Sequence, residues 1–462
     1  TPESMSLKKA EIESNPYWIQ VGSDTHGGSI DNTTSGDHFG RAVACSHDGT
    51  RVIVGAYVHS GNQGKVEVYD WNGSSWTQVG STLTGTADND LFGRAVAISG
   101  DGTIIAVAAP REHSNGIVDS GSVRVYYLVG STWTILPDSG PQTLSVGASN
   151  VLDAFVGQGV DYRMGQGGVK LSYDGKTLLL GEAKYDSGGL TNRGLVRVFT
   201  YANGAWSQKG DDLLGDYTQE EFGQGLDMSE DGNHLIIGTK LQGGTSQPPR
   251  VEVYQWNGSA WAQKGSSITY AGTDDGFGPS VSISNDGNTI ATGIKNADIA
   301  EGAPADNAGA VYVYHWSGSA WGTPHTLFQN VTDDDDFGDH HVMSGDGKKI
   351  IVGAASADDG GTNSGRLYTF EYTGVSWVRR EVPSVGADGG ANAYLGMGPS
   401  NSAWSHAISR DGSVIVAGES GFYTNGAAYS GRVRIYNMPS TIKSIWGSND
   451  DVNWTKIVSG PT

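Results

Sequence analysis

The sequence predicts an all-β protein, a seven-bladed β-propeller of four-stranded antiparallel blades that the N-terminal strand closes. Three observations lead there: a composition rich in glycine and poor in charge, a turn motif that recurs seven times, and a tryptophan pattern that balances only if the first strand joins the last unit. Glycine fills 70 of the 462 positions, and charged residues make up 17% of the chain, against about 25% in typical soluble domains. This composition is typical of turn-rich sheets and not of helical bundles. The 13 Trp and 20 Tyr supply apolar material for packed sheets, so global disorder is not expected.

The repeated unit is anchored by a Ser-x-Asp-Gly motif. A short alternating apolar segment precedes each motif, as in residues 41–45, and another follows it, as in residues 51–55. Both segments are predicted strands. The Asp-Gly pair between them predicts a type I′ hairpin turn, in which both central residues have positive φ. The repeated aspartates, to which we assign a structural role, are Asp48, Asp101, Asp174, Asp231, Asp286, Asp346 and Asp411.

A third predicted strand has the form Gly-x-Val-x-Val-Tyr, as in residues 64–69, and a turn then leads to a tryptophan that begins an outer strand. Because the tryptophan recurs once in each unit, we expect it to be a packing position. Four-stranded sheets repeated seven times are typical of a propeller. The tryptophans at this place are Trp18, Trp76, Trp133, Trp206, Trp261, Trp321 and Trp377.

The two ends of the chain indicate how the ring closes. The seventh unit has no outer strand, because Asn-Met-Pro follows Tyr436, whereas residues 18–22 match residues 76–80. The N-terminal strand should therefore complete the seventh blade, which removes the open sheet edges. We expect a linker or short helix over residues 1–15, the propeller over residues 16–438, and a tail over residues 439–462.

Phe-Gly pairs open five of the units, at residues 39–40, 92–93, 222–223, 277–278 and 337–338. With them the chain resembles FG-GAP repeat proteins, whose best-known members form the seven-bladed head of integrin α subunits. The third unit departs from the pattern with Met164-Gly165 and the seventh with Ser402-Ala403. Residues 442–457 resemble part of a discoidin-like module. Because the chain starts with Thr1 and ends in this segment, we expect the natural polypeptide to be longer at both ends.

The resemblance implies calcium in Asp-x-Asp-x-Asp-Gly loops. Each turn of this chain has one carboxylate, which cannot supply the six to eight oxygen ligands that calcium takes. A better candidate is the connector ahead of each Phe-Gly pair, where acidic residues cluster, although such runs are also typical of solvated loops. The candidate calcium ligands are Asp88, Asp90, Asp274, Asp275, Asp333, Asp334 and Asp335.

Charge and single residues exclude several classes of function. The net charge of −21 disfavours nucleic acid and anionic membranes as partners, and no apolar run is long enough to cross a bilayer. The single cysteine, Cys45, forms no intrachain disulfide, and its alignment with apolar positions indicates a core residue. His340 and His341 should point to opposite faces of a strand and so cannot bind a metal as a pair.

Five Asn-x-Ser/Thr sequons could carry N-glycans if the chain passes through a eukaryotic secretory route. Two of them, Asn72 and Asn257, also suit tight turns. The five are Asn32, Asn72, Asn257, Asn330 and Asn453.

In a meander the variable second and fourth connectors share one face, and function on a repeat scaffold usually sits on such loops. We expect a non-enzymatic extracellular protein, or one on a cell or virion surface, that uses this face to bind protein or glycan ligands or to build a surface layer. No recognisable catalytic motif occurs. The alternative is a secreted polysaccharide hydrolase or lyase, with carboxylates from residues 333–336 or 358–359.

Overall fold

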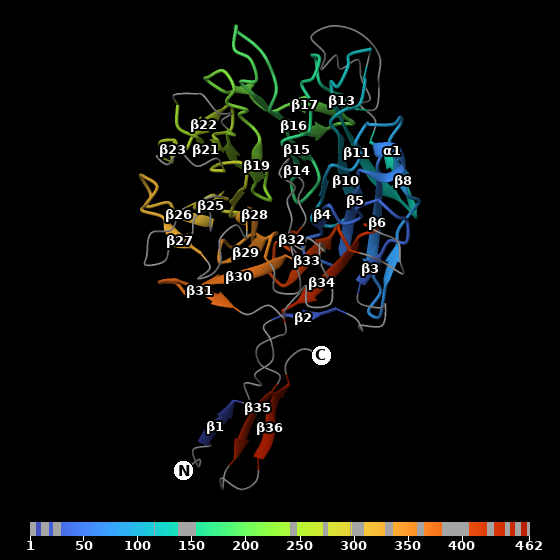
Figure 1. Cartoon of the computed structure of the whole chain (residues 1–462). Helices are drawn as coiled ribbons and strands as arrows, with labels where there is room; N and C mark the ends of the chain where they lie inside the picture. Colours follow the sequence, from blue (N-terminus) through green and yellow to red (C-terminus); the bar gives the residue numbers. More distant parts are fainter. Residues whose placement is uncertain are drawn as a thin grey trace.

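A computed structural model of the chain shows seven antiparallel sheets arranged around a central channel (Figure 1). The fold is all-β, and in six of the seven sheets the strands follow one another in chain order from the channel outward. The prediction of seven blades is therefore confirmed. The structure describes residues 6–10, 18–21, 29–114, 116–136, 154–240, 247–270, 276–295, 297, 309–328, 336–357, 365–380, 406–422, 429–438, 444–448 and 454–459.

Each blade has four successive strands. The innermost strands are β4 (Ala42–Cys45), β9 (Ala95–Ile98), β14 (Val169–Leu171), β19 (Gly225–Met228), β24 (Val281–Ile283), β28 (Phe337–Met343) and β32 (His406–Ile408). The second strands are β5 (Arg51–Ala56), β10 (Ile104–Ala109), β15 (Thr177–Glu182), β20 (His234–Gly238), β25 (Thr289–Ile294), β29 (Lys349–Ala354) and β33 (Val414–Glu419). The third strands are β6 (Lys65–Trp71), β11 (Ser122–Val129), β16 (Leu195–Ala202), β21 (Arg250–Trp256), β26 (Ala310–His315), β30 (Arg366–Tyr372) and β34 (Arg432–Asn437). The outer strands are β7 (Trp76–Gln78), β12 (Thr132–Ile135), β17 (Ala205–Gln208), β22 (Trp261–Gln263), β27 (His325–Leu327), β31 (Trp377–Arg380) and β2 (Ile19–Gln20).

Five blades contain one strand more than the sequence predicted. In the first blade β7 pairs with one half of β6, and the chain then returns to pair β8 with the other half, so that Leu83 lies opposite Val66. The outer edge is thus one strand broken in two. The added strands are β3 (Ser29–Asp31), β8 (Leu83–Thr84), β13 (Phe155–Val156), β18 (Leu213–Leu214) and β23 (Ile268–Thr269).

The closure of the ring is also confirmed. Strand β2 pairs with β34, with Ile19 opposite Asn437 and Gln20 opposite Tyr436. Trp18, directly before β2, is 1% exposed and packs in a cluster shared by the sixth and seventh blades. The first and last parts of the propeller are therefore held together by one sheet.

The Ser-x-Asp-Gly turns differ from the predicted type. In the second blade the Asp101 carboxylate accepts hydrogen bonds from the Ser99 hydroxyl (2.7 Å) and the Thr103 amide (2.9 Å), and the Gly102 amide donates to the Ser99 carbonyl (2.9 Å). Gly102 has φ +73°, whereas the aspartate is not among the residues with positive φ. The prediction of a type I′ turn was wrong, because the side-chain bonds to Asp101 hold a longer turn in which glycine alone is left-handed.

The hydrophobic core lies between neighbouring blades. All five phenylalanines of the Phe-Gly pairs are at most 1% exposed, and Phe92 packs with residues of the first and second blades. The glycine that follows, Gly93, has φ +85°, and a Cβ there would lie 2.7 Å from the Val66 side chain. The motif therefore combines a buried ring with a backbone position that only glycine fits.

The end segments form a separate sheet of β1 (Ser6–Ala10), β35 (Ser444–Ser448) and β36 (Trp454–Ser459). Residues 6–10 are thus a strand, where the sequence suggested a linker or a helical turn, because they pair with β35. The resemblance of the hairpin β35–β36 to discoidin-like modules stays a prediction. The one short helix within the described ranges, α1 (His59–Asn62), is part of a loop, and none of the helices described there could cross a membrane.

Candidate functional site

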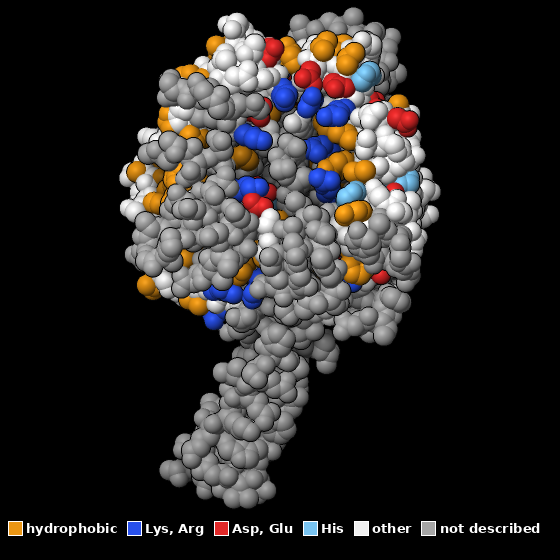
Figure 2. Space-filling model, viewed as in Figure 1, with side chains coloured by type: hydrophobic (Ala, Val, Ile, Leu, Met, Phe, Trp, Pro, Cys, Tyr) orange, Lys and Arg blue, Asp and Glu red, His pale blue; other side chains and the backbone are white. Residues whose placement is uncertain are grey.

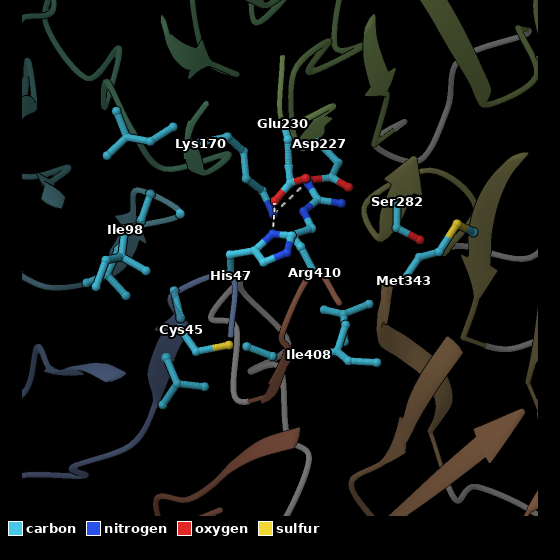
Figure 3. A pocket seen from close by; sticks show the side chains of 18 of the residues that line it. Cys45, His47, Ile98, Lys170, Asp227, Glu230, Ser282, Met343, Ile408 and Arg410 are labelled. Atoms are coloured by element: carbon cyan, nitrogen blue, oxygen red, sulfur yellow. Dashed lines mark hydrogen bonds and ion pairs between the residues drawn. The ribbon is translucent and has the colours of Figure 1, made fainter. Parts of the chain in front are cut away.

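The seven innermost strands surround the central channel, which contains a cavity of about 130 Å³. Apolar side chains from the ends of these strands line part of it, among them Cys45, Ile98 and Met343, and a group of charged side chains gathers at one side (Figure 3). The channel has two ends. The Ser-x-Asp-Gly turns lie at one, which we call the short-turn end, and the variable loops lie at the other, the long-loop face.

At the short-turn end a ring of hydrogen bonds joins all seven blades. It is built from the variable residue of each Ser-x-Asp-Gly motif, since the repeat brings seven equivalent turns to the channel axis. Six of the seven links join backbone amides to backbone carbonyls, and the amide of Glu230 donates instead to the side chain of Asn285. The links join His47 to Gly100, Gly100 to Tyr173, Tyr173 to Glu230, Glu230 to Asn285, Asn285 to Gly345, Gly345 to Arg410 and Asp411 to His47, at 2.7 to 3.4 Å.

Side chains also cross the channel at this end. The His47 imidazole contacts the Glu230 carboxylate at 2.6 Å, from the first blade to the fourth, and Asn285 donates to the other Glu230 oxygen at 2.6 Å. The Arg410 guanidinium donates to the carbonyl of Met228 at 2.7 Å. These contacts tie blades on opposite sides of the channel to one another.

A buried carboxylate, Asp227, lies next to this ring. It interacts with Lys170 at 3.2 Å and with Arg410 at 3.6 Å, and it accepts a hydrogen bond from the Ile283 amide at 3.0 Å. Burial by itself would raise the pKa of Asp227, but the positive charges of Lys170 and Arg410 and the backbone bonds outweigh it and lower that pKa. The carboxylate is therefore ionised and paired at neutral pH.

Three buried histidines line the sixth and seventh innermost strands. His340 lies 3.1 Å from His406 of the seventh blade, whereas His341 contacts the Ser280 hydroxyl of the fifth blade at 2.8 Å. The two neighbours thus face opposite blades, as the strand periodicity predicted. Burial lowers the pKa of His341 to about 4 and that of His406 to about 3, so both rings are neutral at pH 7.

At the long-loop face the channel is surrounded by Lys and Arg side chains (Figure 2). The strand bounds place Arg41 and Arg94 directly before innermost strands, and Arg111, Lys240 and Lys295 soon after second strands. All five belong to this end, because the Ser-x-Asp-Gly turns occupy the opposite ends of the same strands. A strongly acidic protein therefore carries a basic rim on its long-loop face.

Two carboxylates lie beside this rim. Asp336 pairs with Lys295 at 2.9 Å and accepts a hydrogen bond from the Ser356 hydroxyl at 2.6 Å. Burial raises the pKa of Asp339 to about 6, although Lys295 opposes the shift. Asp339 follows the Phe-Gly pair of the sixth unit, and the sequence analysis did not single it out.

The predicted calcium ligands are only partly within the described residues. Asp274, Asp275, Asp333, Asp334 and Asp335 lie outside them. Asp90 is buried, and its Oδ2 accepts hydrogen bonds from the Thr86 amide and hydroxyl and from the Ala87 amide at 2.7 to 2.9 Å, which gives it a structural role in the connector. Nowhere in the described ranges do three or more acidic, histidine or cysteine side chains form a metal-binding group. Calcium binding through the remaining candidates stays a prediction.

The sequons have different surroundings. Asn72 and Asn257 are exposed in turns, where their side-chain oxygens accept backbone hydrogen bonds at 2.9 Å. The Asn32 amide donates to Asp37 at 2.9 Å and to the Ser430 carbonyl at 3.0 Å. Asn330 and Asn453 lie outside the described residues. Glycosylation stays a prediction at all five.

The repeated tryptophans differ in burial. Trp18, Trp133 and Trp206 are at most 7% exposed, and the others are partly buried. Trp321 lies before β27 and joins Trp316 in an isolated bridge. Cys45 is partly exposed, lines the channel and packs against the core of the first and seventh blades. Burial raises the pKa of its thiol to about 12, and Asp411 and Asp48 add to the shift.

Sequence reasoning missed the variable residue of the turn motif. It treated the seven aspartates as the informative positions, yet the residue before each aspartate forms the ring. The signal was present, because a turn that joins the two inner strands of each blade must end near the axis, and the residues at this place include a histidine, a glutamate and an arginine.

Comparison with known proteins supports the fold. A family model described as the FG-GAP repeat matches residues 31–69 and 76–126, and no curated protein matches the chain. Among solved structures, hydrazine synthase of Kuenenia stuttgartiensis is 14% identical with a TM-score of 0.50, over 91% of this chain and 98% of that one. The WD40 domain of Neurospora crassa Pan2 is 12% identical, with a TM-score of 0.47, over 92% and 96%. A periplasmic gluconolactonase of Pseudomonas aeruginosa is 15% identical, with a TM-score of 0.46, over 74% and 84%.

Such low identities bear on the fold alone. The five Phe-Gly pairs, the seven repeated turns and the matched family model agree with one another. The protein is a seven-bladed β-propeller with FG-GAP repeats.

Proposed function

We propose that the protein is a non-enzymatic binding or assembly protein of the extracellular space or of a cell or particle surface, and that its long-loop face contacts protein or glycan ligands. The observation that carries this proposal is the difference between the two ends of the channel. At the short-turn end the same turn recurs in every blade, and the ring of hydrogen bonds links the blades to one another. The side chains there serve cohesion.

The long-loop face supports the proposal in a second way, because it differs from blade to blade. Within the described part, the first blade has the helical turn α1 in its long loop, the second has an isolated bridge between Ser114 and Ile117, and the third has one between Ser187 and Leu190. Loops that vary on a constant scaffold are where recognition usually resides. The basic rim gives this face a charge opposite to that of the chain as a whole.

The test compares two double charge reversals of equal size. Arg111→Glu with Lys184→Glu alters the long-loop face, and Lys176→Glu with Lys348→Glu alters exposed turns at the short-turn end. Each protein is used in a pull-down from secreted and cell-surface fractions and on a glycan array, with and without calcium. We expect the first variant to lose ligands that the second retains.

A polysaccharide-degradation assay runs beside the binding assays, because the alternative function is a hydrolase or lyase. Turnover that disappears in Asp336→Asn with Asp339→Asn, together with no ligand captured by the unmodified protein, would overturn the proposal in favour of that enzyme. Equal loss of ligand in both charge-reversal variants would show that the long-loop face is not the binding face.

A further inference from the structure

Arg94 is a buried arginine without a carboxylate partner in the part of the chain that the structure describes. It is 6% exposed and directly follows the Phe-Gly pair of the second blade. The other four buried arginines in that part are each paired with a glutamate of their own blade. These pairs are Arg124 with Glu112 (2.5 Å), Arg250 with Glu252 (2.7 Å), Arg432 with Glu419 (2.5 Å) and Arg434 with Glu419 (3.1 Å).

An unpaired buried charge is unfavourable, so its surroundings matter. Arg41 holds the same place in the first blade. The guanidinium carbons of Arg41 and Arg94 lie 4.9 and 5.2 Å from the centroid of the Tyr57 ring. The negative face of an aromatic ring attracts cations, and Tyr57 therefore holds the two arginines in place from within the protein.

A third arginine acts on the same group. Burial lowers the pKa of the Arg94 guanidinium, and the positive charges of Arg41 and Arg111 lower it further, while Tyr57 opposes them. Among the described groups that shift this pKa there is no carboxylate. Three guanidinium groups thus come together with one tyrosine, on a chain that carries 50 acidic residues against 29 basic ones.

We propose that Arg94, Arg41 and Arg111 form a site for one oxyanion group, a sulfate, phosphate or carboxylate. The proposal deepens the proposed function, on which it rests, by naming the chemistry of a ligand of the long-loop face. Guanidinium forks match the oxygens of such anions in pairs of charge-assisted hydrogen bonds. Arg94 lies deep, Arg41 is partly exposed and Arg111 is exposed, so an anion that enters from solvent passes Arg111 first and neutralises Arg94.

The test uses inorganic anions and the full chain. Sodium sulfate, sodium phosphate and sodium acetate are titrated calorimetrically at constant ionic strength, with chloride as the background. We expect saturable binding by the unmodified protein, at least about tenfold weaker binding by Arg94→Gln, and a smaller loss with Arg41→Gln, since each variant removes charge-assisted bonds. The order of the three anions tells a tetrahedral group from a carboxylate.

The matched control is Arg379→Gln. Arg379 also lies over a tyrosine, 4.6 Å from the Tyr368 centroid, but it is exposed on the outer strand of the sixth blade. It should bind the anion as the unmodified protein does. Without the anion, Arg94→Gln should melt at the same temperature as the unmodified protein or higher, because the change removes an unpaired buried charge. If Arg94→Gln does not fold, Arg111→Gln tests the same site from its exposed side.

No saturable heat with any of the three salts, or equal affinity in the unmodified protein and Arg94→Gln, would overturn the site. Either result leaves the proposed function to be decided by the pull-down. A saturable anion site in a protein that captures no ligand would support the site and count against the wider binding role.

Discussion

Replacement of Trp18 by alanine tests whether the N-terminal strand holds the ring closed. The indole is 1% exposed and packs against Ile351 and Leu367 of the sixth blade and Ile415 and Tyr436 of the seventh. A tryptophan side chain buries about 200 Å², which at about 25 cal/mol per Å² corresponds to ~5 kcal/mol. This value is an upper bound, because an unfolded chain already buries part of its surface. We expect a loss of about 3–5 kcal/mol in the free energy of unfolding.

The assay is urea unfolding followed by circular dichroism, and the control is Trp76→Ala. Trp76 begins the corresponding outer strand of the first blade, but it is only partly buried. Its loss does not affect closure, so Trp18→Ala should lower stability at least about twice as much, given the dependence of such losses on burial. Equal losses in the two variants, or no loss with Trp18→Ala, would refute the closure argument.

Three further predictions concern single groups. Asp101→Ala removes hydrogen bonds from one hydroxyl and one amide and should cost about 2 kcal/mol in thermal stability, whereas Asp101→Asn, which keeps an acceptor oxygen, should cost less; equal effects would contradict this role. Because burial lowers the pKa of His341 to about 4 and that of His406 to about 3, the unfolded chain takes up protons first below about pH 6.5, and stability present above that pH should fall as the pH drops towards 4. Melting temperatures from pH 7.5 to 4.5 should show this decline, with a shallower slope in His406→Gln, and a flat profile would count against neutral buried rings. Burial raises the pKa of Cys45 to about 12, so Ellman's reagent at pH 8 should react slowly with the folded protein and fully in urea; rapid reaction of the folded protein would be inconsistent with this.

Much of the scaffold could be predicted because its signals are local. The Asp101 turn is held by hydrogen bonds within five residues, so every copy of the motif folds in the same way wherever it stands in the chain. The Phe-Gly pair likewise specifies its own buried position. The match of residues 18–22 with residues 76–80 predicted the closure, since a strand that repeats an outer-strand pattern must occupy an outer-strand place.

The turn type and the broken outer strands could not be predicted with the same rules. Asp-Gly is the usual signal of a type I′ turn, and only the bonds to the Asp101 side chain showed a longer turn with one left-handed residue. The pairing of Leu83 with Val66 in a second short strand depends on how the connector returns across the blade. These features follow from competing local interactions whose balance a pattern does not give.

The sequence by itself determined the seven blades, their order and the closure by the N-terminal strand, because each depends on a motif repeated in register. Only the tertiary structure decided which residues meet at the channel. His47 and Glu230 are 183 positions apart along the chain, and Arg94 becomes an unpaired cation only when Tyr57 and Arg41 of the neighbouring blade pack around it. Such contacts arise between units of the repeat, where spacing carries no information about which side chains will face one another.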